Sequence, residues 1–254
     1  MNILKNTVDS KFNLRGFTPT PNILVRGFIE TSFLDWDGKV CSVVFLPYCN
    51  FRCPFCNNSL LVETPEILPE VKMEKIEGFL ERGKDFIDGI VITGGEPTMH
   101  PWLPELIKRF RTLGFLIKLD TNGTNPSLLT NLLTNRLTDF VAMDLKAPLN
   151  DKYNQLTNTK VDLEKIKESI KIIMNSGLDY EFRTTVVPTL LGKAEIEEMA
   201  KSISNAKKLV LQQFVPIHTL DEKMRSLPAY SKEKLLEMQA IAKKYVPNTI
   251  VRGV

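Results

Sequence analysis

The sequence predicts an α/β fold built on a parallel sheet. From residue 40 onward, short apolar runs rich in Val, Ile and Leu alternate with longer amphipathic segments. Such alternation is typical of successive strand–helix units, and about six units follow one another. A chain of 254 residues, 43% hydrophobic and 25% charged, is large enough for a substantial core. We therefore expect one domain over residues 1–254.

Within this domain we expect a loose N-terminal arm over residues 1–20, because this stretch is polar and patternless. A core follows over residues 40–216, and a C-terminal extension over residues 217–254. Short apolar runs predict strands at 40–46, 88–93, 115–120, 139–145, 182–187 and 208–215. Weaker patterns allow one or two strands within 22–33 and a terminal strand at 249–251.

The helices are predicted from their end signals and periodicity. Pro69 begins and Gly83 ends the first, and Gly114 stops a second over 102–113. Asn125 caps a third, which has Pro126 at its first position. Further helices are expected from Asp162 to Gly177, at 194–203, and from Ser231 to about residue 245.

Three cysteines follow the first core strand with the spacing C-x3-C-x2-C: Cys49, Cys53 and Cys56. A thiolate trio on a short loop predicts a site for a soft metal. Zinc requires a fourth ligand, and an ordinary [4Fe–4S] cluster a fourth cysteine. The remaining cysteine, Cys41, lies inside the strand. Three ligands on a four-iron cluster leave one iron open for chemistry, whereas a structural zinc site completed from elsewhere is the alternative.

Polar motifs also follow three later strands. Gly94 and Gly95 allow close approach of the backbone to a ligand, and Glu96 can accept a hydrogen bond from an ammonium group. Asp120 and Asp144 end successive predicted strands, so their carboxylates can converge on one cation or one donor-rich ligand. Each residue alone is equally compatible with ordinary turn formation.

The cysteine spacing, with Phe55 before the third cysteine, resembles the signature of radical S-adenosylmethionine (SAM) enzymes. A wider motif consists of residues 35–39 (DWDGK) and 49–58 (CNFRCPFCNN). This motif resembles the activating proteins of glycyl radical enzymes, in particular the longer type of anaerobic ribonucleoside-triphosphate reductase activating protein. The resemblance extends in pieces from about Gly27 to Pro216. It implies a partial (β/α)6 TIM-like barrel of the radical SAM type with a short N-terminal extension, and an active site at the carboxyl ends of the strands.

The resemblance also implies the cofactors and their residues. The three cysteines hold a [4Fe–4S] cluster, and SAM binds its open iron and is reductively cleaved to methionine and a 5′-deoxyadenosyl radical. Side chains of Asp120, Thr121 and Asp144, with the Ala142 carbonyl, correspond to a monovalent cation site. The remaining positions implied to bind or face SAM are Phe55, Gly94, Gly95, Glu96, Pro97, Asn122, Lys146, Arg183 and His218. Lys146 and Arg183 are in addition implied to act in catalysis.

Two departures from the family pattern concern the same region. Many glycyl radical activases carry histidine directly after the third cysteine, where this chain has Asn57. There is also no further cysteine-rich insertion between Cys56 and Gly94, which argues against auxiliary ferredoxin-like clusters.

Composition limits the partners. The net charge of +3 is small and its Lys and Arg residues are spread, so we expect no nucleic acid partner. No apolar run is long enough to span a membrane, and the cysteine usage suits a reducing cytoplasm. The resemblance implies a glycyl radical enzyme as partner, foremost anaerobic ribonucleotide reductase, and an electron donor of the flavodoxin or ferredoxin type.

Three alternatives remain from the sequence. The first is an activase of another glycyl radical enzyme, such as pyruvate formate-lyase. The second is a small-molecule radical SAM enzyme such as a 7-carboxy-7-deazaguanine synthase, which also has a Thr-Asn-Gly turn. The third is a non-catalytic iron–sulfur or zinc protein.

Overall fold

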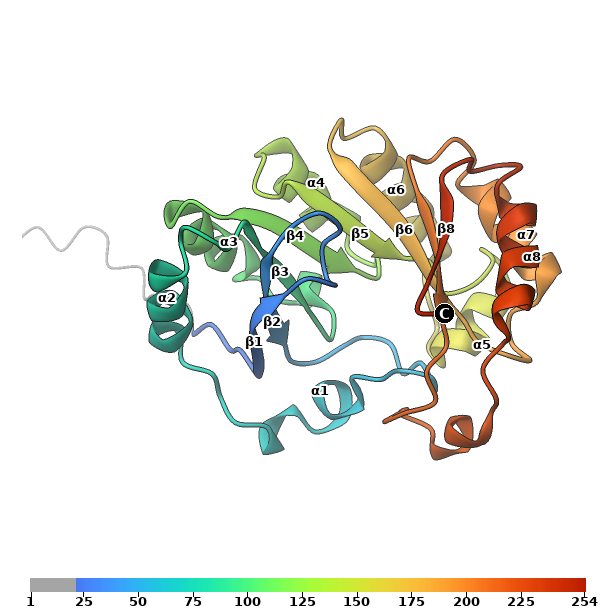
Figure 1. The fold of residues 1–254 in the computed structure, drawn as a ribbon, viewed down its shortest axis with the longest axis horizontal. Coiled ribbons are helices and arrows are strands. Elements are labelled where there is room, and N and C mark those ends of the chain that lie inside the picture. Colours follow the sequence, from blue (N-terminus) through green and yellow to red (C-terminus); the bar gives the residue numbers. More distant parts are fainter. Residues whose placement is uncertain (1–21) are drawn as a thin grey trace, which may run out of the picture.

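The computed structural model describes residues 22–254, which form one curved sheet with helices around its outside (Figure 1). The expected arm over residues 1–20 lies outside the described residues. Eight strands make up the sheet in the order in which they occur in the chain. They are β1 (Gly27–Ser32), β2 (Cys41–Leu46), β3 (Gly89–Gly94), β4 (Leu116–Thr121), β5 (Phe140–Asp144), β6 (Asp179–Val186), β7 (Leu209–Gln213) and β8 (Thr249–Arg252).

The strand order confirms the predicted parallel sheet and identifies its type. Strand β1 runs antiparallel to β2, and all neighbours from β2 to β8 are parallel. A sequential order is typical of a barrel, whereas a doubly wound sheet reverses direction partway. No described strand pairs β1 with β8, so the sheet is an open, partial barrel. Six strand–helix units lead from β2 to β8, as the sequence predicts.

Helices connect the parallel strands by crossovers of one hand, which places them on the same face of the sheet. They follow one another around the outside in Figure 1. The helices are α1 (Ser59–Glu63), α2 (Met73–Arg82), α3 (Leu103–Thr112), α4 (Pro126–Thr134), α5 (Asp151–Thr157), α6 (Leu163–Met174), α7 (Lys193–Ser202) and α8 (Lys232–Ala242). Within residues 22–254, none of them has the length and apolar character required to cross a bilayer.

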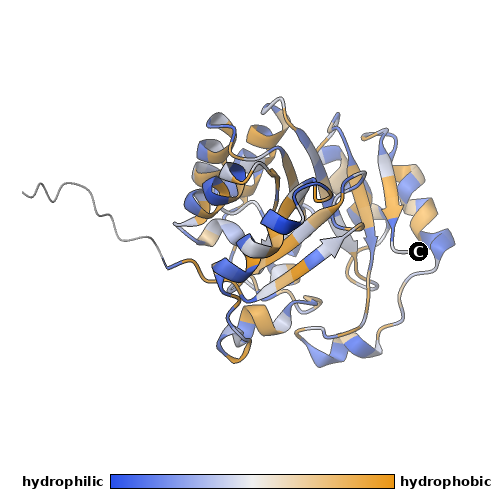
Figure 2. Ribbon diagram, turned by 60° about the vertical axis from the view of Figure 1, so that its left-hand side comes forward, coloured by the Kyte–Doolittle hydropathy of each residue, from blue (hydrophilic) through white to orange (hydrophobic). Residues whose placement is uncertain are grey.

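The two faces of the sheet differ in chemistry because side chains alternate along each strand. Outward side chains such as Ile92, Leu119 and Phe182 are buried against the helices and form the main core. Figure 2 shows hydrophobic residues concentrated in the strands and on parts of the helices. On β6, the intervening residues Glu181 and Arg183 belong to the other, inner face and are charged although buried. The barrel interior is therefore partly polar.

Several boundaries differ from the predictions. Helix α2 begins at Met73 and not at Pro69, because the chain before it is extended and the Val71 amide donates to the Val25 carbonyl at 2.9 Å. Strand β6 begins three residues earlier than predicted. The sequence predictions omitted the short helices α1 and α5. Capping of α4 by Asn125, α6 by Asp162 and α8 by Ser231 is confirmed by hydrogen bonds from the first-turn amides to these side chains.

Ion pairs tie the β1–β2 turn to the opposite edge of the sheet. One oxygen of Asp37 accepts hydrogen bonds from Lys208 at 2.6 Å and from Arg252 on β8 at 3.0 Å. Both cations also pair with Glu181, which is 2% exposed. Asp37 and Lys208 lie before the amino ends of β2 and β7, and Arg252 reaches them from the last residue of β8. These contacts link the two unpaired edges and leave the carboxyl ends of β3 to β7 free to form a pocket.

Candidate active site

A pocket of about 240 Å³ lies at the carboxyl ends of strands β3 to β7, beneath the cysteine loop that follows β2. All predicted site residues line this pocket except Pro97, His218 and Ala142, whose carbonyl was expected beside the cation. They come from five separate parts of the chain, because the ends of parallel strands meet at one edge of the sheet. The fold thus assembles the predicted motifs into one site.

The cysteine loop is held in place by its own backbone and by α5. The Arg52 guanidinium donates to the carbonyls of Cys49 at 2.6 Å and Phe51 at 2.8 Å, and its amide donates to the Thr157 carbonyl at 2.9 Å. The Cys56 amide donates to the carbonyl of Cys53, which closes a turn between these two cysteines. These hydrogen bonds attach the loop to α5 and shape the turn between its last two cysteines.

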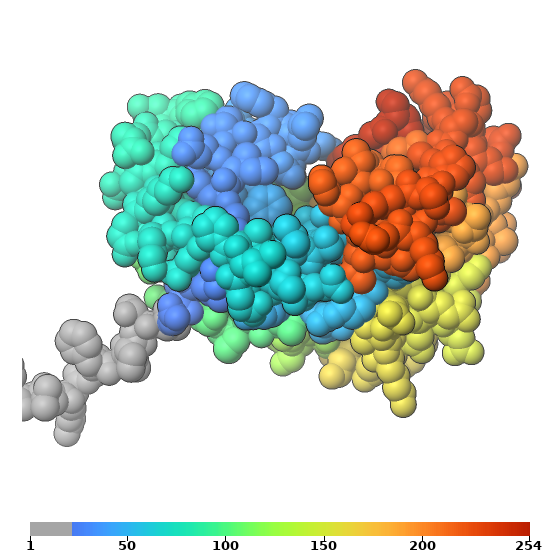
Figure 3. Space-filling view, turned by 90° about the horizontal axis from the view of Figure 1, so that it is seen from below, coloured from blue at the N-terminus to red at the C-terminus, as the bar shows by residue number. Residues whose placement is uncertain are grey.

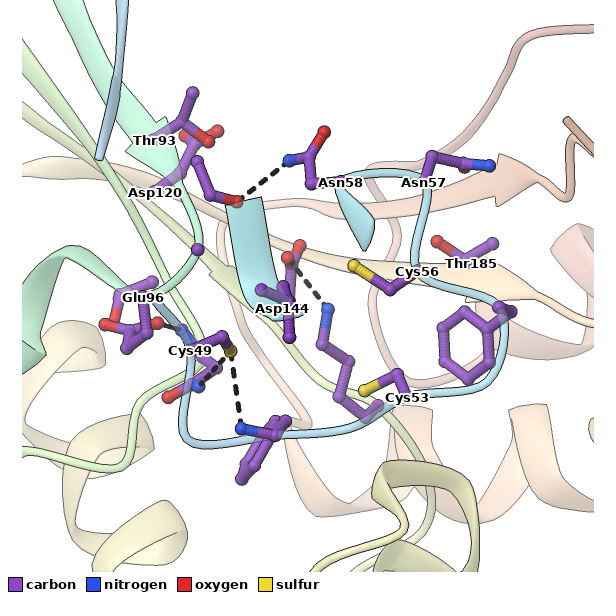
Figure 4. Close-up of a pocket in the computed structure, with 18 of the residues that line it drawn as sticks. Cys49, Cys53, Cys56, Asn57, Asn58, Thr93, Glu96, Asp120, Asp144 and Thr185 are labelled. Atoms are coloured by element: carbon purple, nitrogen blue, oxygen red, sulfur yellow. Dashed lines mark hydrogen bonds and ion pairs between the residues drawn. The ribbon is translucent and has the colours of Figure 1, made fainter. Parts of the chain in front are cut away.

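The three thiols surround a common space. Figure 4 shows the sulfur atoms of Cys53 and Cys56 directed into the same part of the pocket, with Cys49 across from them. All three are free and at least half-buried. Burial raises the pKa of the Cys49 thiol to about 11 and that of Cys53 to about 12. Soft thiolates facing one pocket suit an iron–sulfur cluster, whereas Cys41 is buried in β2 and does not line this pocket.

Within residues 22–254, no three acidic, His or Cys side chains converge tightly enough to hold a single metal ion. The three cysteines therefore line a shared pocket without forming a site of single-ion size. A group larger than one ion fits this arrangement of donors better than zinc does.

Gly95 permits the closest contact in the site. A Cβ atom built on Gly95 would lie 1.7 Å from the Tyr48 carbonyl oxygen, just before the first cysteine. Gly94 adopts φ +119°, a conformation that other residues rarely adopt. The Gly95 and Glu96 amides donate to the carbonyls of Leu46 and Tyr48 at 2.9 and 2.7 Å. The glycines thus allow the loop after β3 to pack against the start of the cysteine loop.

Replacing Gly95 with alanine is expected to lower the free energy of unfolding by more than about 2 kcal/mol, because backbone atoms must move to admit the methyl group. Urea unfolding of the protein measures this change. The matched control is Gly78→Ala in α2, where the new Cβ would meet only the end of Arg82 at 3.6 Å. That variant is expected to be as stable as the wild type or more stable. Equal stability of both variants would contradict the close packing at Gly95.

The Glu96 carboxylate lines the pocket and is also bound by protein groups. Glu96 is 1% exposed. Its Oε1 accepts from the Thr98 amide at 3.0 Å, from the Thr98 hydroxyl and from the Thr121 hydroxyl at 2.7 Å, and its Oε2 accepts from the Asn122 amide at 2.6 Å. Burial raises the pKa of Glu96 and these donors oppose the rise. Glu96 therefore joins the ends of β3 and β4.

Four charged side chains form a network on the floor of the pocket. Arg183 donates through Nε to Asp144 Oδ1 at 2.9 Å and through Nη1 to Asp120 Oδ2 at 3.0 Å. Lys146 donates to Asp144 Oδ2 at 3.1 Å. Although burial favours the neutral acid, Arg183 and Lys146 lower the pKa of Asp144 to about 2. Asp144 is thus ionised, and the network presents both signs of charge to the pocket.

The predicted cation position between Asp120 and Asp144 is spanned by the Arg183 guanidinium. The Thr121 hydroxyl, also predicted as a cation ligand, donates to Glu96 and accepts from the Gly123 amide at 3.1 Å. In this arrangement the three predicted side chains bind protein groups and do not converge on a free cation. One oxygen, Asp120 Oδ1, is buried and has no hydrogen bond within the described residues.

Two of the predicted SAM-binding residues lie outside the pocket. Pro97 begins a buried 3₁₀ turn behind the loop. His218 is exposed, with φ 54°, and its carbonyl accepts from the Ser59 hydroxyl at 3.1 Å. The described structure therefore does not place His218 where it contacts a ligand in the pocket.

Sequence reasoning missed several residues that line the pocket. They are Phe51, Asn58, Val62, Thr93, Thr185 and Gln212, and Asn57, which was noted only as a departure. Thr185 has the same inward orientation as Arg183, two residues earlier on β6, so strand alternation provides a signal for it. Gln212 lies one residue before the end of β7. No local signal identifies Asn58, whose amide donates to the Gly94 carbonyl at 2.8 Å.

The family model of the radical SAM superfamily matches residues 43–206, which include every cysteine of the loop and the whole pocket floor. The chain belongs to the radical SAM superfamily. Radical SAM enzymes use a [4Fe–4S] cluster and SAM, so the chain is an enzyme of this chemistry, and a non-catalytic zinc protein is excluded as its class.

Named relatives place this radical SAM protein near activating enzymes. A Methanocaldococcus jannaschii protein, named as a predicted glycyl-radical enzyme activating enzyme, is 35% identical over 91% of this chain and 96% of its own length. The pyruvate formate-lyase-activating enzyme of Clostridium pasteurianum is 27% identical over 82% of this chain and 92% of its own length. In fold, the chain resembles Streptococcus suis SuiB solved with SAM, at TM-score 0.63 and 16% identity over 83% of this chain and 52% of that one.

Proposed function

We propose that this radical SAM protein activates a glycyl radical enzyme, foremost an anaerobic ribonucleoside-triphosphate reductase. The single observation that carries the proposal is the convergence of three thiols, each at least half-buried, with the glycine loop and the Asp–Arg–Lys floor in one pocket at the open end of a partial barrel. Similarity to named activating enzymes over most of both chains supports it. The choice of ribonucleotide reductase as the partner rests only on the sequence motif around the cysteines.

In this proposal Cys49, Cys53 and Cys56 hold the cluster. Their thiols line the same pocket, and the Lys146 ammonium nearby favours their ionised form. When bound and reduced, the cluster would supply the one electron needed to break the S–C5′ bond of SAM. A glycine Cα hydrogen would be transferred to C5′, with methionine, 5′-deoxyadenosine and a glycyl radical on the partner as products. The protein itself positions the reacting groups and excludes other hydrogen donors.

Four groups of the pocket keep hydrogen-bonding capacity that the described residues do not use, and they fit the two charged ends of the SAM amino acid. The Gly95 carbonyl accepts no hydrogen bond from residues 22–254, so it is free to accept from an ammonium. Arg183 Nη2 donates to none of the described residues and, with Lys146, is available to a carboxylate. Asp120 Oδ1 is a further acceptor without a hydrogen bond. We assign these four groups to SAM binding.

The barrel remains open where β1 and β8 fail to pair, and a partner segment has to enter there to bring a backbone glycine to the pocket. Figure 3 shows the surface hollowed between the residues of β1 and β2, in blue, and those near residue 220, in orange. A small-molecule substrate does not need such an entrance. The open side therefore favours a polypeptide substrate over the deazaguanine synthase alternative.

The test uses the anaerobically reconstituted, reduced protein with SAM and either an anaerobic ribonucleotide reductase or a pyruvate formate-lyase from the same source. We expect 5′-deoxyadenosine to form and a glycyl radical signal to appear by electron paramagnetic resonance on the reductase. A signal on the lyase alone would replace the proposed partner. If SAM is cleaved but neither protein acquires a radical, the activase function is rejected.

A further inference from the structure

The segment that follows β7 crosses the outside of the cysteine loop. We call residues 214–221 the strap. The Leu220 amide donates to the Cys56 carbonyl at 3.1 Å and the Asp221 amide to the Pro54 carbonyl at 2.9 Å. The Ser59 hydroxyl donates to the His218 carbonyl at 3.1 Å. Figure 3 shows the two segments side by side, light blue for the cysteine loop and orange for the strap.

Asn57 makes two further bonds to the strap. Its side-chain amide donates to the Val215 carbonyl at 3.1 Å and to the carbonyl of Ile217. Figure 4 shows this side chain directed away from the three cysteines. The two hydrogens of one NH2 group diverge, so they can reach carbonyls two residues apart. The nitrogens of an imidazole lie apart on the ring, and the neutral ring carries one N–H, so histidine cannot replace this pair of bonds.

Hydrophobic packing contributes little to holding the strap. Only Phe214 and Thr219 are buried, whereas Val215 and Ile217 are 44% and 55% exposed. Hydrogen bonds therefore provide most of the attachment, and Asn57 and its neighbour Cys56 participate in three of the five that join the strap to residues 54–59. Removing the Asn57 amide should release the strap without disturbing the core.

We propose that Asn57 is a positioning residue that clamps the strap onto the cysteine loop and thereby fixes Cys56 as a cluster ligand. The inference rests on the proposed function in one respect, because it takes Cys56 to be a ligand. Asn57 itself does not contact the reacting atoms. It acts through the backbone on both sides of Cys56, whose carbonyl and following side chain are both bound to the strap.

The experiment compares wild type with Asn57→Ala in the anaerobically reconstituted protein. Hydrogen exchange at the amides of Leu220 and Asp221 is expected to accelerate at least about tenfold in the variant. The reason is that opening of the strap no longer requires the two Asn57 hydrogen bonds to break. Iron release to a chelator is expected to be about tenfold faster, as is common when a residue supporting a metal ligand is removed. Asn57→Gln, which keeps the donor group, should restore part of both effects.

Asn58→Ala is the matched control. Asn58 is the next residue, but its amide bonds to Gly94 and not to the strap. Strap exchange is expected to stay at the wild-type rate in this variant. Unchanged strap exchange in Asn57→Ala, or equal acceleration in Asn58→Ala, would overturn the inference. If Asn57→Ala fails to fold, Ser59→Ala is used in its place, because it removes only one hydrogen bond to the strap. Hydrogen exchange is then measured at the same amides. Both readouts are taken without SAM, so they are independent of the SAM cleavage assay.

Discussion

Replacing Cys53 with alanine is expected to abolish 5′-deoxyadenosine formation from SAM. Cys53 is the most buried of the three loop cysteines, and its thiol faces the space shared with Cys56. Without it, two thiolates remain, which are too few to hold a four-iron cluster with one open iron. We expect the rate to fall at least about 1,000-fold, or about 4 kcal/mol. Product is measured by chromatography, and iron and sulfide are measured per chain.

Cys41→Ala is the matched control for this variant. Cys41 is fully buried on β2 but lies outside the pocket, where its thiol donates to the Ser32 carbonyl at 3.6 Å. This variant should lose some stability and keep wild-type iron content. Loss of iron in Cys41→Ala together with full loading in Cys53→Ala would refute the ligand assignment.

Replacing Arg183 with methionine is expected to lower the free energy of unfolding by about 3–5 kcal/mol. Arg183 is 9% exposed and binds both Asp120 and Asp144. Its removal leaves two carboxylates in the barrel, of which Asp144 retains only Lys146 as a partner. SAM binding should weaken in the same variant, because the free Nη2 donor is lost. Chemical denaturation and equilibrium SAM binding measure the two effects.

The control is Arg109→Met, which removes the contacts of Nε and Nη2 with one oxygen of Glu77, Oε1, where the Arg109 side chain is 34% exposed. Its expected cost is below about 1 kcal/mol. Adding Asp120→Asn to Arg183→Met should recover part of the lost stability, since the carboxylate that loses its hydrogen bond from Arg183 is then neutral. Similar costs for Arg183→Met and Arg109→Met would show that the pocket network is not a buried one.

Much of the site was predictable because its motifs are local. The three cysteines lie within eight residues, and the glycine pair directly follows a strand. Strand ends meet at one edge of a parallel sheet, so the sequence also predicts that Asp120 and Asp144 approach each other. Helix caps such as Asn125 and Ser231 were correct for the same reason, since a cap requires only residues three or four apart.

The interactions of these residues were less predictable. Glu96 was expected to face a ligand, and its carboxylate also bonds to groups 25 and 26 residues further along the chain. His218 follows the expected pattern in the sequence, yet lies exposed beside Ser59. Asn57 was recorded only as an unusual residue, because its partners are 158 and 160 residues away.

By itself, the sequence determined the strand–helix alternation, the cysteine loop and the edge of the sheet where the motifs gather. Periodicity, caps and motif spacing act over a few residues, so they are visible without the fold. Only the tertiary structure decided which charges pair. Register places Asp144 beside Arg183 on adjacent strands, and strand alternation directs Asp120 to the same inner face. Contacts of this kind depend on the relative position of distant segments, which local patterns do not specify.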